Sequence, residues 1–268
     1  MSTRAVILAR GLGSRMRRID GEVTLDPAQA TAADGGAKAM MPVGRPLVEH
    51  ILTALADAGM REAVLVIGPE HGAVRAHFAA HPGRRLRISF AEQARPLGTA
   101  DAVLAARDAL GNRDFIVLNG DTWYLPEVIR AVAATPANAF GAFDAEALLR
   151  QSNIPAERLL AFALCEVGND GLLRAIVEKP APDHPLAQAQ PRIVSMNLWH
   201  LSAAIFRVLP QLRPSPRGEL EIQDAIRLLM QSGEPVRAVP ISAGALDLST
   251  RADVASVTAQ LAARAVDY

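Results

Sequence analysis

Cysteine, aromatic residues and net charge are all scarce in this sequence of 268 residues. Cys165 is the only cysteine, which excludes an intramolecular disulfide and predicts a reducing, cytoplasmic location. Lysine and arginine total 28, as do aspartate and glutamate, so we expect neither nucleic acid nor a membrane surface as a partner. No run of about 18 apolar residues is present, and the apolar segment 5–9 is too short for the core of a signal peptide.

Lysine is almost absent, because Lys38 and Lys179 are the only lysines among the 28 basic residues. An alanine-rich chain that uses arginine in place of lysine is typical of a coding bias. Lysine would then persist where a compact ammonium fits and a planar guanidinium does not. The alternative is chance, and the motifs around the two lysines must decide between these interpretations.

Apolar periodicity predicts a repeated strand–helix order in the first half of the chain. Helix 99–110 is expected to have Thr99 as its N-cap. Units of this kind form a largely parallel sheet covered by helices. The predicted strands are 4–9, 63–67, 86–90 and 115–118, and the predicted helices are 46–59, 70–80, 99–110 and 125–134.

The second half changes character, with two strands joined by the hairpin-type turn Gly168-Asn169-Asp170-Gly171. We expect one α/β domain over residues 1–268, in which this half adds antiparallel strands to a mostly parallel, mixed sheet. Ligands of such open sheets bind at the C-terminal ends of the strands. The predicted strands are 159–167, 172–178, 192–201, 236–240 and 245–248, and the predicted helices are 202–209, 220–231 and 251–263.

A glycine-rich turn follows the first strand and reads Arg10-Gly11-Leu12-Gly13-Ser14-Arg15. Its glycines offer bare N–H groups to a phosphate, and Arg15 can add a bidentate contact. Met16 stands where a dinucleotide-binding motif needs a third glycine, and the lysine of a P-loop is missing. The alternative is an ordinary turn with exposed arginines.

Lys38-Ala39-Met40-Met41-Pro42-Val43 and Pro46-Leu47 come next in the chain. This order of motifs resembles the sugar-1-phosphate nucleotidylyltransferases, which have a Rossmann-like three-layer α/β/α fold of the nucleotide-diphospho-sugar transferase type. The resemblance implies a nucleotide-binding half at 1–135 and an acceptor-binding half at 136–268. It implies that Lys38 neutralises a triphosphate and that the loop binds it through Leu8, Ala9, Gly11, Gly13, Ser14 and Arg15.

Three features depart from the family pattern. Arg10 stands where the family usually has alanine or glycine, and Ser14 stands where it often has threonine. Segment 20–37 is longer than usual between the loop and the lysine. We expect a lid that orders on nucleotide binding, with an inert insertion as the alternative.

The run Gln93-Ala94-Arg95-Pro96-Leu97-Gly98-Thr99 follows the strand predicted at 86–90. Glutamine offers both a donor and an acceptor, which suits the edge of a nucleobase, and Thr99 begins a helix whose N-terminus favours anions. The run resembles the base-recognition loop of uridylyl- and thymidylyltransferases, where glutamine reads a pyrimidine and guanylyltransferases tend to have glutamate. The resemblance therefore implies UTP or dTTP, with GTP as an alternative, and Gln93, Pro96, Gly98 and Thr99 as nucleotide-binding residues.

Two aspartates are the predicted ligands of Mg²⁺, which prefers one or two carboxylates together with phosphate oxygens and water. Asp121 follows Asn119-Gly120 at the tip of a central strand and resembles the family's Gly-Asp metal ligand, with Gly120 beside the nucleotide. Asp247, in Leu246-Asp247-Leu248-Ser249-Thr250, resembles the second ligand. The alternatives are a turn aspartate and a helix cap.

The acceptor site is predicted from Val177-Glu178-Lys179-Pro180, which in the family holds the sugar phosphate. The resemblance extends to Asn197, which implies a contact with the sugar, and to Glu219 in Gly218-Glu219-Leu220-Glu221. Trp199 is predicted either to stack on an apolar sugar face or to fill the core. Both lysines thus fall in motifs that bind phosphate, which favours the functional interpretation of their scarcity.

The reaction implied by the resemblance joins a nucleoside triphosphate to a sugar 1-phosphate and releases pyrophosphate. Arg15, Lys38, Asp121 and Lys179 are the implied catalytic residues, Mg²⁺ is the implied cofactor, and a homo-oligomer is expected. The alternatives are a degenerate homologue that binds a nucleotide sugar without catalysis, and transfer to a non-sugar phosphate such as phosphocholine or a cyclitol phosphate.

Overall fold

The computed structural model describes residues 2–18 and 23–268, and within these ranges the main sheet has nine strands. Seven of them follow the order β10-β9-β11-β6-β1-β4-β5, while β8 pairs with β11 and β12 pairs with β8. The strands from the first half are β1 (Arg4–Leu8), β4 (Glu62–Ile67), β5 (Arg87–Glu92) and β6 (Phe115–Asn119), and they pair in parallel. The others are β8 (Ala139–Asp144), β9 (Ala163–Val167), β10 (Leu173–Glu178), β11 (Ile193–Leu201) and β12 (Arg237–Ile241).

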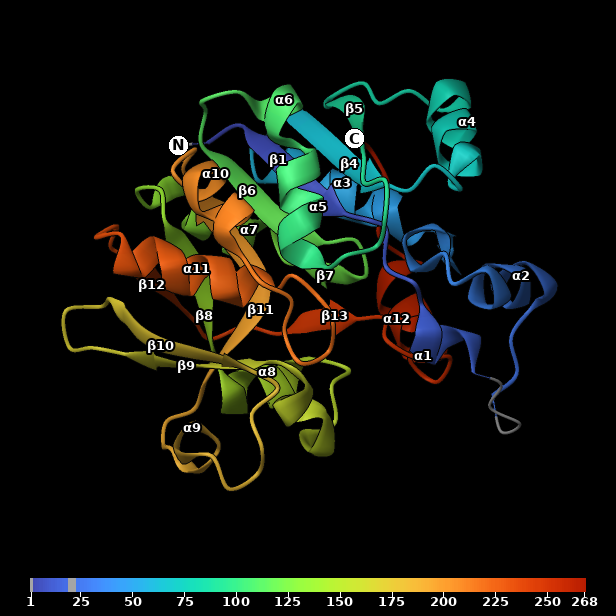
Figure 1. Ribbon diagram of the computed structural model, residues 1–268. Helices are drawn as coiled ribbons and strands as arrows, with labels where there is room; N and C mark the ends of the chain where they lie inside the picture. The colour runs from blue at the N-terminus through green and yellow to red at the C-terminus, as the bar shows by residue number, and fades with distance from the viewer. Residues whose placement is uncertain (1, 19–22) are drawn as a thin grey trace.

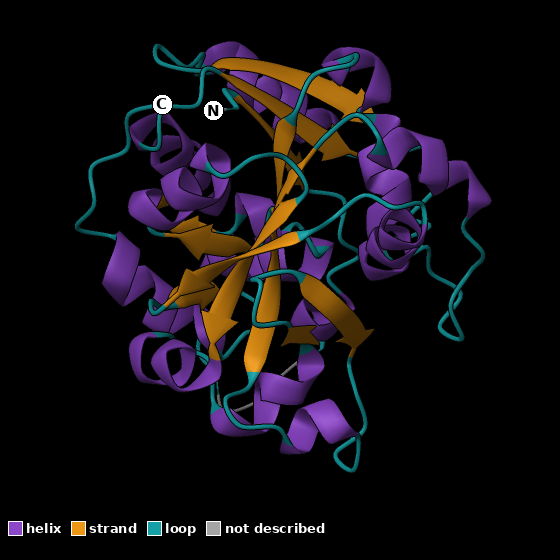
Figure 2. Ribbon diagram, turned by 90° about the vertical axis from the view of Figure 1, so that its left-hand side faces the viewer, coloured by secondary structure: helices purple, strands orange, loops and turns teal. Residues whose placement is uncertain are grey.

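Alternate residues of the central strands face opposite cores. In β1, Ala5 and Ile7 lie in one core cluster and Val6 lies in the other. This period of two, with both faces apolar, is what a sheet covered by helices on both sides requires. The strands accordingly run through the middle of the molecule with helices on either side (Figure 2).

The helices divide between the two faces of the sheet. One face is covered mainly by α3 (Leu47–Asp57), α4 (Gly72–Ala80), α7 (Pro126–Ala134) and α12 (Asp253–Leu261). The other is covered by α5 (Thr99–Ala105), α6 (Arg107–Leu110), α10 (Ile205–Val208) and α11 (Ile222–Gln231), of which α5, α10 and α11 lie in front in Figure 1. The shorter elements are α1 (Ser14–Arg17), α2 (Pro27–Gly35), α8 (Ala145–Gln151) and α9 (Pro185–Gln188), the 3₁₀ turns η1 (Lys38–Met40), η2 (Ala156–Ala161) and η3 (Leu209–Gln211), and the strand pairs β2 (Pro42–Val43) with β3 (Arg45–Pro46) and β7 (Thr122–Tyr124) with β13 (Ala245–Asp247).

Strand β11 joins the two halves of the chain into one sheet. Its first residues pair with β9 and its last residues pair with β6, while β8 lies along its other side. The register shifts between Ser195 and Trp199, and Asn197 in this interval has a left-handed φ of 61°. The irregularity lies where β11 changes partner from β9 to β6, and bulges of this kind re-aim side chains near binding sites.

The alternating strand and helix order predicted from the sequence is found, with local corrections. The helix predicted at 99–110 is divided into α5 and α6, and residues 159–161 belong to η2 instead of a strand. Thr99 does not cap α5, since Gly98 holds the cap position without a side-chain bond and the Thr99 hydroxyl accepts from Ile222 N at 2.9 Å instead. Strand β8 was not predicted, and the boundary between the halves at residue 135 stays a prediction.

Segment 23–37 packs against the body of the protein through α2. Asp34 accepts from Arg251 at 2.5 Å, and Gln29 Nε2 donates to the carbonyl of Pro42 at 3.0 Å. Residues 20–22 of the predicted lid lie outside the described residues, so lid motion stays a prediction. No helix in the described part of the chain is long and apolar enough to cross a membrane.

Gly98→Ala tests how closely the loop before α5 approaches the loop before α11. Gly98 has a φ of +119°, and a Cβ built there would lie 2.5 Å from the carbonyl oxygen of Leu220. Alanine must therefore strain its own backbone and displace that carbonyl. We expect a loss of about 2–3 kcal/mol in the free energy of unfolding, measured by urea denaturation.

The matched control is Gly111→Ala, because Gly111 also has a positive φ, of +61°, but has nothing within 4 Å of a built Cβ. It should lose less, about 1–2 kcal/mol, because only the backbone conformation, with a φ of 61° and a ψ of −138°, is strained. Equal losses in the two variants would contradict the close packing of the two loops.

Candidate active site

One cavity of about 500 Å³ lies at the C-terminal ends of β1 and β6. It is lined by all twelve residues predicted to bind the nucleotide, together with Lys38, Lys179 and Glu219. The structure thus brings these fifteen predicted residues, which extend from Leu8 to Glu219 in the sequence, to a single place. The binding roles of these residues stay predictions. The lining residues that were not predicted are Arg10, Leu12, Ala39, Ala102 and Asn119.

The glycine-rich turn forms part of the cavity wall. Gly13 has a left-handed φ of 60° and begins the short helix α1, and a Cβ there would meet the carbonyl of Gly36 at 2.5 Å. Only glycine fits this contact, which holds the turn against the segment that leads to Lys38. Arg15 is exposed, and no described carboxylate lies within ion-pair distance of it. Its guanidinium is therefore available to an anion in the cavity.

Lys38 and Asp121 both line the cavity and form an ion pair there. Lys38 Nζ lies 2.8 Å from Asp121 Oδ2, and the lysine side chain is 13% exposed. Asp121 reaches this point because Gly120 N donates to Leu8 O at 2.9 Å, which ties the end of β6 to the end of β1. A Cβ on Gly120 would lie 3.0 Å from Leu8 O, so glycine permits the approach.

Asp247 lies beside Asp121 because β13 pairs with β7, where Asp247 is opposite Thr122. Its Oδ2 accepts from Arg158 Nη2 at 2.6 Å and from Ser249 Oγ at 2.6 Å. Burial and then the charge of Asp121 raise the pKa of Asp247 to about 6, and together they outweigh the Ser249 hydrogen bond and the Arg158 charge, which lower it.

Asp121 lines the cavity and fits a magnesium ion in the presence of a nucleotide, whereas Asp247 is 4% exposed and does not line the cavity, so the metal roles of the two stay predictions. Each has one oxygen paired with a cation, Asp121 Oδ2 with Lys38 and Asp247 Oδ2 with Arg158. Asp121 Oδ1 accepts only a distant bond of 3.4 Å from Thr122. Within residues 2–18 and 23–268, no group of three or more acidic, histidine or cysteine side chains is placed to hold a metal, so phosphates and water would supply the other ligands.

Gln93 lines the same cavity as the glycine-rich turn and is 3% exposed. Its main-chain N–H donates to Ile67 O at 2.9 Å, which continues the end of β5 against β4. Its side-chain Nε2 donates to Gly98 O at 3.0 Å and to Asp101 Oδ2 at 2.8 Å. The side chain is thus held firmly in the wall of the predicted base-binding end of the cavity.

Arg10, the residue that departs from the family pattern, braces this base end. Its Nε and Nη2 each donate to Glu70 at 3.1 Å, and its Nη1 donates to the carbonyl of Gln93. Arg10 lowers the pKa of Glu70, so the pair stays charged at neutral pH. Two of the five N–H donors of Arg10 remain after these three bonds, on a side chain that lines the cavity.

Two of the five predicted acceptor residues, Lys179 and Glu219, line the same cavity. Lys179 has a left-handed φ of 47°, which is rare for a residue other than glycine, and its Nζ lies 3.6 Å from Glu178 Oε1. Arg217 Nη2 lies 3.6 Å from the same Glu178 oxygen and 2.5 Å from Glu221. Burial raises the pKa of Glu178. Glu178 stands behind Lys179 and does not itself line the cavity.

Trp199 fills the core, which corrects its prediction as a sugar-binding residue. The side chain is fully buried and packs beside Phe140, with ring centroids 5.3 Å apart, so it has no face for a sugar. Its indole N–H points toward Asn197 Oδ1 at 3.4 Å, and the same oxygen accepts from Gln223 at 2.9 Å. Asn197 does not line the cavity, and its predicted contact with a sugar stays a prediction.

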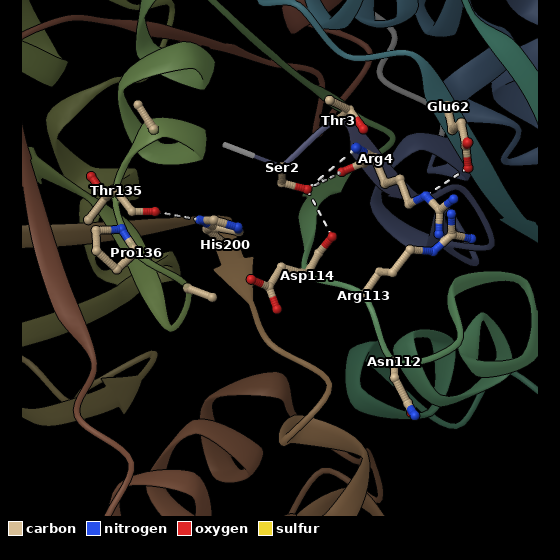
Figure 3. Close-up of a pocket in the computed structure, with 12 residues that line it drawn as sticks. Ser2, Thr3, Arg4, Glu62, Asn112, Arg113, Asp114, Thr135, Pro136 and His200 are labelled. Carbon is tan, nitrogen blue, oxygen red and sulfur yellow. Dashed lines mark hydrogen bonds and ion pairs between the residues drawn. The ribbon is translucent and has the colours of Figure 1, made fainter.

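A second hollow of about 680 Å³ lies at the opposite ends of β1 and β6. Figure 3 shows Arg4 paired with Glu62 at 2.8 Å, Ser2 bonded to Asp114 O at 2.9 Å, and His200 Nδ1 bonded to Thr135 O at 2.8 Å. Its labelled residues include two arginines, Arg4 and Arg113, and two acids, Glu62 and Asp114. The hollow therefore favours neither an anionic nor a cationic ligand. The residues with phosphate-binding chemistry lie at the other end of the strands.

Sequence patterns did not point to Asp101, Arg158 or Arg217, which hold Gln93, Asp247 and Glu178 respectively. Asp101 is separated from Gln93 by eight positions and Arg158 from Asp247 by 89, and no periodicity connects them. Only Arg217 had a local signal, since it begins the run that contains Glu219.

The profile of the nucleotidyl transferase family matches residues 4–263 of the chain. The chain is 31% identical over 242 residues to a glucose-1-phosphate thymidylyltransferase of Streptomyces griseus, with 89% of this chain and 60% of that protein aligned. It is 27% identical over 248 residues to a UTP–glucose-1-phosphate uridylyltransferase of Haloferax volcanii, with 91% and 90% aligned. The chain spans 58 to 65% of the length of three of the curated relatives it matches.

The fold is similar to that of a UDP-glucose pyrophosphorylase solved in complex with UDP-glucose. The TM-score is 0.75, the identity is 16%, and the alignment covers 97% of this chain and 98% of that chain. This likeness confirms the predicted α/β fold class.

Asp247 predicts a pH dependence of stability in metal-free buffer. Its pKa is about 6 in the folded protein and 3.8 ordinarily, so between these values the folded state holds the proton more tightly than the unfolded state. The contribution of Asp247 to stability is therefore greatest near pH 4 and is lost as the pH rises to 6. Relative to Asp247→Asn, we expect the wild-type free energy of unfolding to fall by about 2 kcal/mol over this range.

Urea denaturation at several pH values measures the difference between the two proteins. Asp121→Asn tests whether the charge of Asp121 helps to raise the pKa of Asp247. Removal of this charge should lower that pKa, so the loss of stability should begin at a lower pH. A difference between wild type and Asp247→Asn that does not change from pH 4 to pH 6 would contradict this account.

Proposed function

The chain belongs to the nucleotidyl transferase family, as its motifs predicted, and on this basis we propose that it joins a nucleoside triphosphate to a sugar 1-phosphate, with release of pyrophosphate. One observation carries the proposal. A single cavity holds the glycine-rich turn, the base-recognition loop, Asp121 and both lysines of the chain. A site for two phosphorylated substrates needs these cations in one place.

The proposed reaction requires no general base. A phosphate oxygen of the sugar 1-phosphate is already anionic and attacks the α-phosphate in line, while the bond from the α-phosphate to the bridging oxygen breaks and pyrophosphate leaves. Catalysis then depends on positioning and on neutralising charge. Lys179 at the cavity edge would hold the attacking phosphate, and Arg15 and Lys38 would steady the departing pyrophosphate.

Lys38 is already directed into the cavity by its ion pair with Asp121. Its ammonium is pre-positioned there, because Gly13 and Gly36 pack so closely that the segment before Lys38 is held against the turn. Bound Mg²⁺ would supply charge neutralisation between the two substrates, on Asp121 and Asp247. Pre-positioned charge of this kind is typically the largest contribution to catalysis of such transfers.

We propose UTP or dTTP as the nucleotide. The support is the base-recognition loop at 93–99 and the names of the relatives, which include a thymidylyltransferase and a uridylyltransferase. Glucose 1-phosphate appears in the names of those relatives and is the first acceptor to test. Cytoplasmic location and homo-oligomeric assembly stay predictions.

The test is pyrophosphate release across nucleotides and acceptors, with and without Mg²⁺, in wild type and in Asp121→Asn. We expect Mg²⁺-dependent turnover with a sugar 1-phosphate and a loss of about 10²–10³-fold in kcat for the variant, because the substitution removes a charge next to the reacting phosphates. The acceptor panel includes phosphocholine and a cyclitol phosphate.

The matched control is Asp108→Asn, which makes the same change at an exposed position on α6 and should leave turnover unchanged. Absence of turnover with every pair, alongside measurable binding of a nucleotide sugar, would favour a non-catalytic homologue. Normal turnover by Asp121→Asn would refute the metal and catalytic roles of this residue.

Lys179→Arg tests whether lysine is needed at the acceptor site. The substitution keeps the positive charge but replaces a compact ammonium with a planar guanidinium, at a position whose backbone φ is 47°. We expect the KM for the sugar phosphate to rise, or kcat to fall, by about tenfold, while the KM for the nucleotide changes little. Steady-state kinetics with each substrate varied in turn measures the effect, and wild-type constants would refute the functional interpretation of the scarce lysines.

A further inference from the structure

The side-chain amide of Gln93 has only one orientation that satisfies its neighbours. Nε2 lies 3.0 Å from the carbonyl of Gly98 and 2.8 Å from Asp101 Oδ2. A carbonyl and an ionised carboxylate both accept hydrogen bonds and cannot donate them. If the amide were reversed, its oxygen would face two other oxygens, so the neighbours fix which end is nitrogen.

This orientation uses both N–H donors of Gln93 and leaves Oε1 as its free hydrogen-bonding atom. Gln93 lines the cavity, and no described donor lies within hydrogen-bond distance of Oε1. Oε1 is not among the buried side-chain atoms that lack a partner, so it is open to a ligand that donates an N–H. The base end of the cavity thus presents an acceptor.

We propose that Asp101 is a specificity-determining positioning residue: by holding the Gln93 amide in this orientation, it makes the site select nucleobases that donate a ring N–H from the Watson–Crick edge to Oε1. Uracil and thymine donate N3–H at this edge. Cytosine and adenine donate there only through their exocyclic amino groups, and in the same pose the lone pair of cytosine N3 or adenine N1 would face Oε1. Guanine N1–H meets the same requirement, so the selection acts against cytosine and adenine. The proposal deepens the proposed function and rests on it for the identity of the ligand.

Asp101 can act as a rigid reference point because α5 is anchored where it begins. Ala100 N donates to Leu220 O at 2.9 Å, and Thr99 Oγ1 accepts from Ile222 N at 2.9 Å. The carboxylate is in the first turn of this anchored helix. An aspartate accepts only, whereas asparagine at the same place can present either a donor or an acceptor.

Asp101→Asn tests the proposal with almost no change of shape. The amide that this substitution introduces can donate to a reversed Gln93, so the preference for UTP over CTP should fall about tenfold, with Gly98 O keeping part of the discrimination. The measurements are kcat/KM for UTP and CTP, for dUTP and dCTP as the deoxy pair, and calorimetric binding of each nucleotide without acceptor. The KM for the sugar phosphate and the thermal midpoint should stay near wild type.

Asp108→Asn on the neighbouring helix is the matched control and should keep the full preference for UTP. If Asp101→Asn does not fold, Asp101→Ser also removes the carboxylate and is expected to reduce the preference. A wild-type protein that binds UTP and CTP equally, or a folded Asp101 variant that keeps the wild-type ratio, would overturn the proposal.

The calorimetric arm separates this inference from the proposed function. A wild type that prefers UTP in binding, with the preference reduced in Asp101→Asn, supports the inference even if no acceptor is turned over. Turnover with a sugar phosphate together with an unchanged nucleotide ratio in Asp101→Asn supports the function and overturns the inference.

Discussion

The negative charge of Asp121 organises the cavity. It draws Lys38 to 2.8 Å, and it contributes to the raised pKa values of both Asp247 and the buried Tyr124. A carboxylate here is costly by itself, since it lies beside a second acid in a partly buried place. The structure offsets that cost with one cation for each carboxylate, Lys38 for Asp121 and Arg158 for Asp247. The site is therefore balanced without a ligand, and a bound cation would compete with existing partners.

The strand–helix order and the position of the cavity could be predicted from the sequence because both depend on local signals. Continuous apolar runs mark β1 and β6, and glycines mark the points where their ends approach each other. Residues as distant as Leu8 and Glu219 were predicted for one site through the family resemblance, and the structure brings them to one cavity.

The contacts that hold the functional side chains could not be predicted in this way. Arg158 reaches Asp247 across 89 positions, and Thr99 bonds to Ile222 across 123, so no window of sequence contains both partners. Trp199 shows a different difficulty, because here the local sequence signal exists but is ambiguous. An aromatic residue near a predicted sugar-binding motif is equally suited to stacking on a sugar and to packing in the core. Its fully buried position depends on Phe140, in a strand that apolar periodicity did not reveal.

The loops before α5 and α11 form one hydrogen-bonded unit. Leu220 N donates to Leu97 O at 2.7 Å and Leu220 O accepts from Ala100 N, while Gly98 leaves no room between them. One loop belongs to the predicted base reader and the other carries Glu219 of the predicted acceptor site. If residues 93–101 alone were replaced by those of a relative, in order to transfer its base preference, the new loop would be shaped to pack against the relative's own loop before α11 and not against this one. Recombination that keeps 93–101 and 217–222 from the same parent preserves this contact, so the two segments form a natural module for engineering.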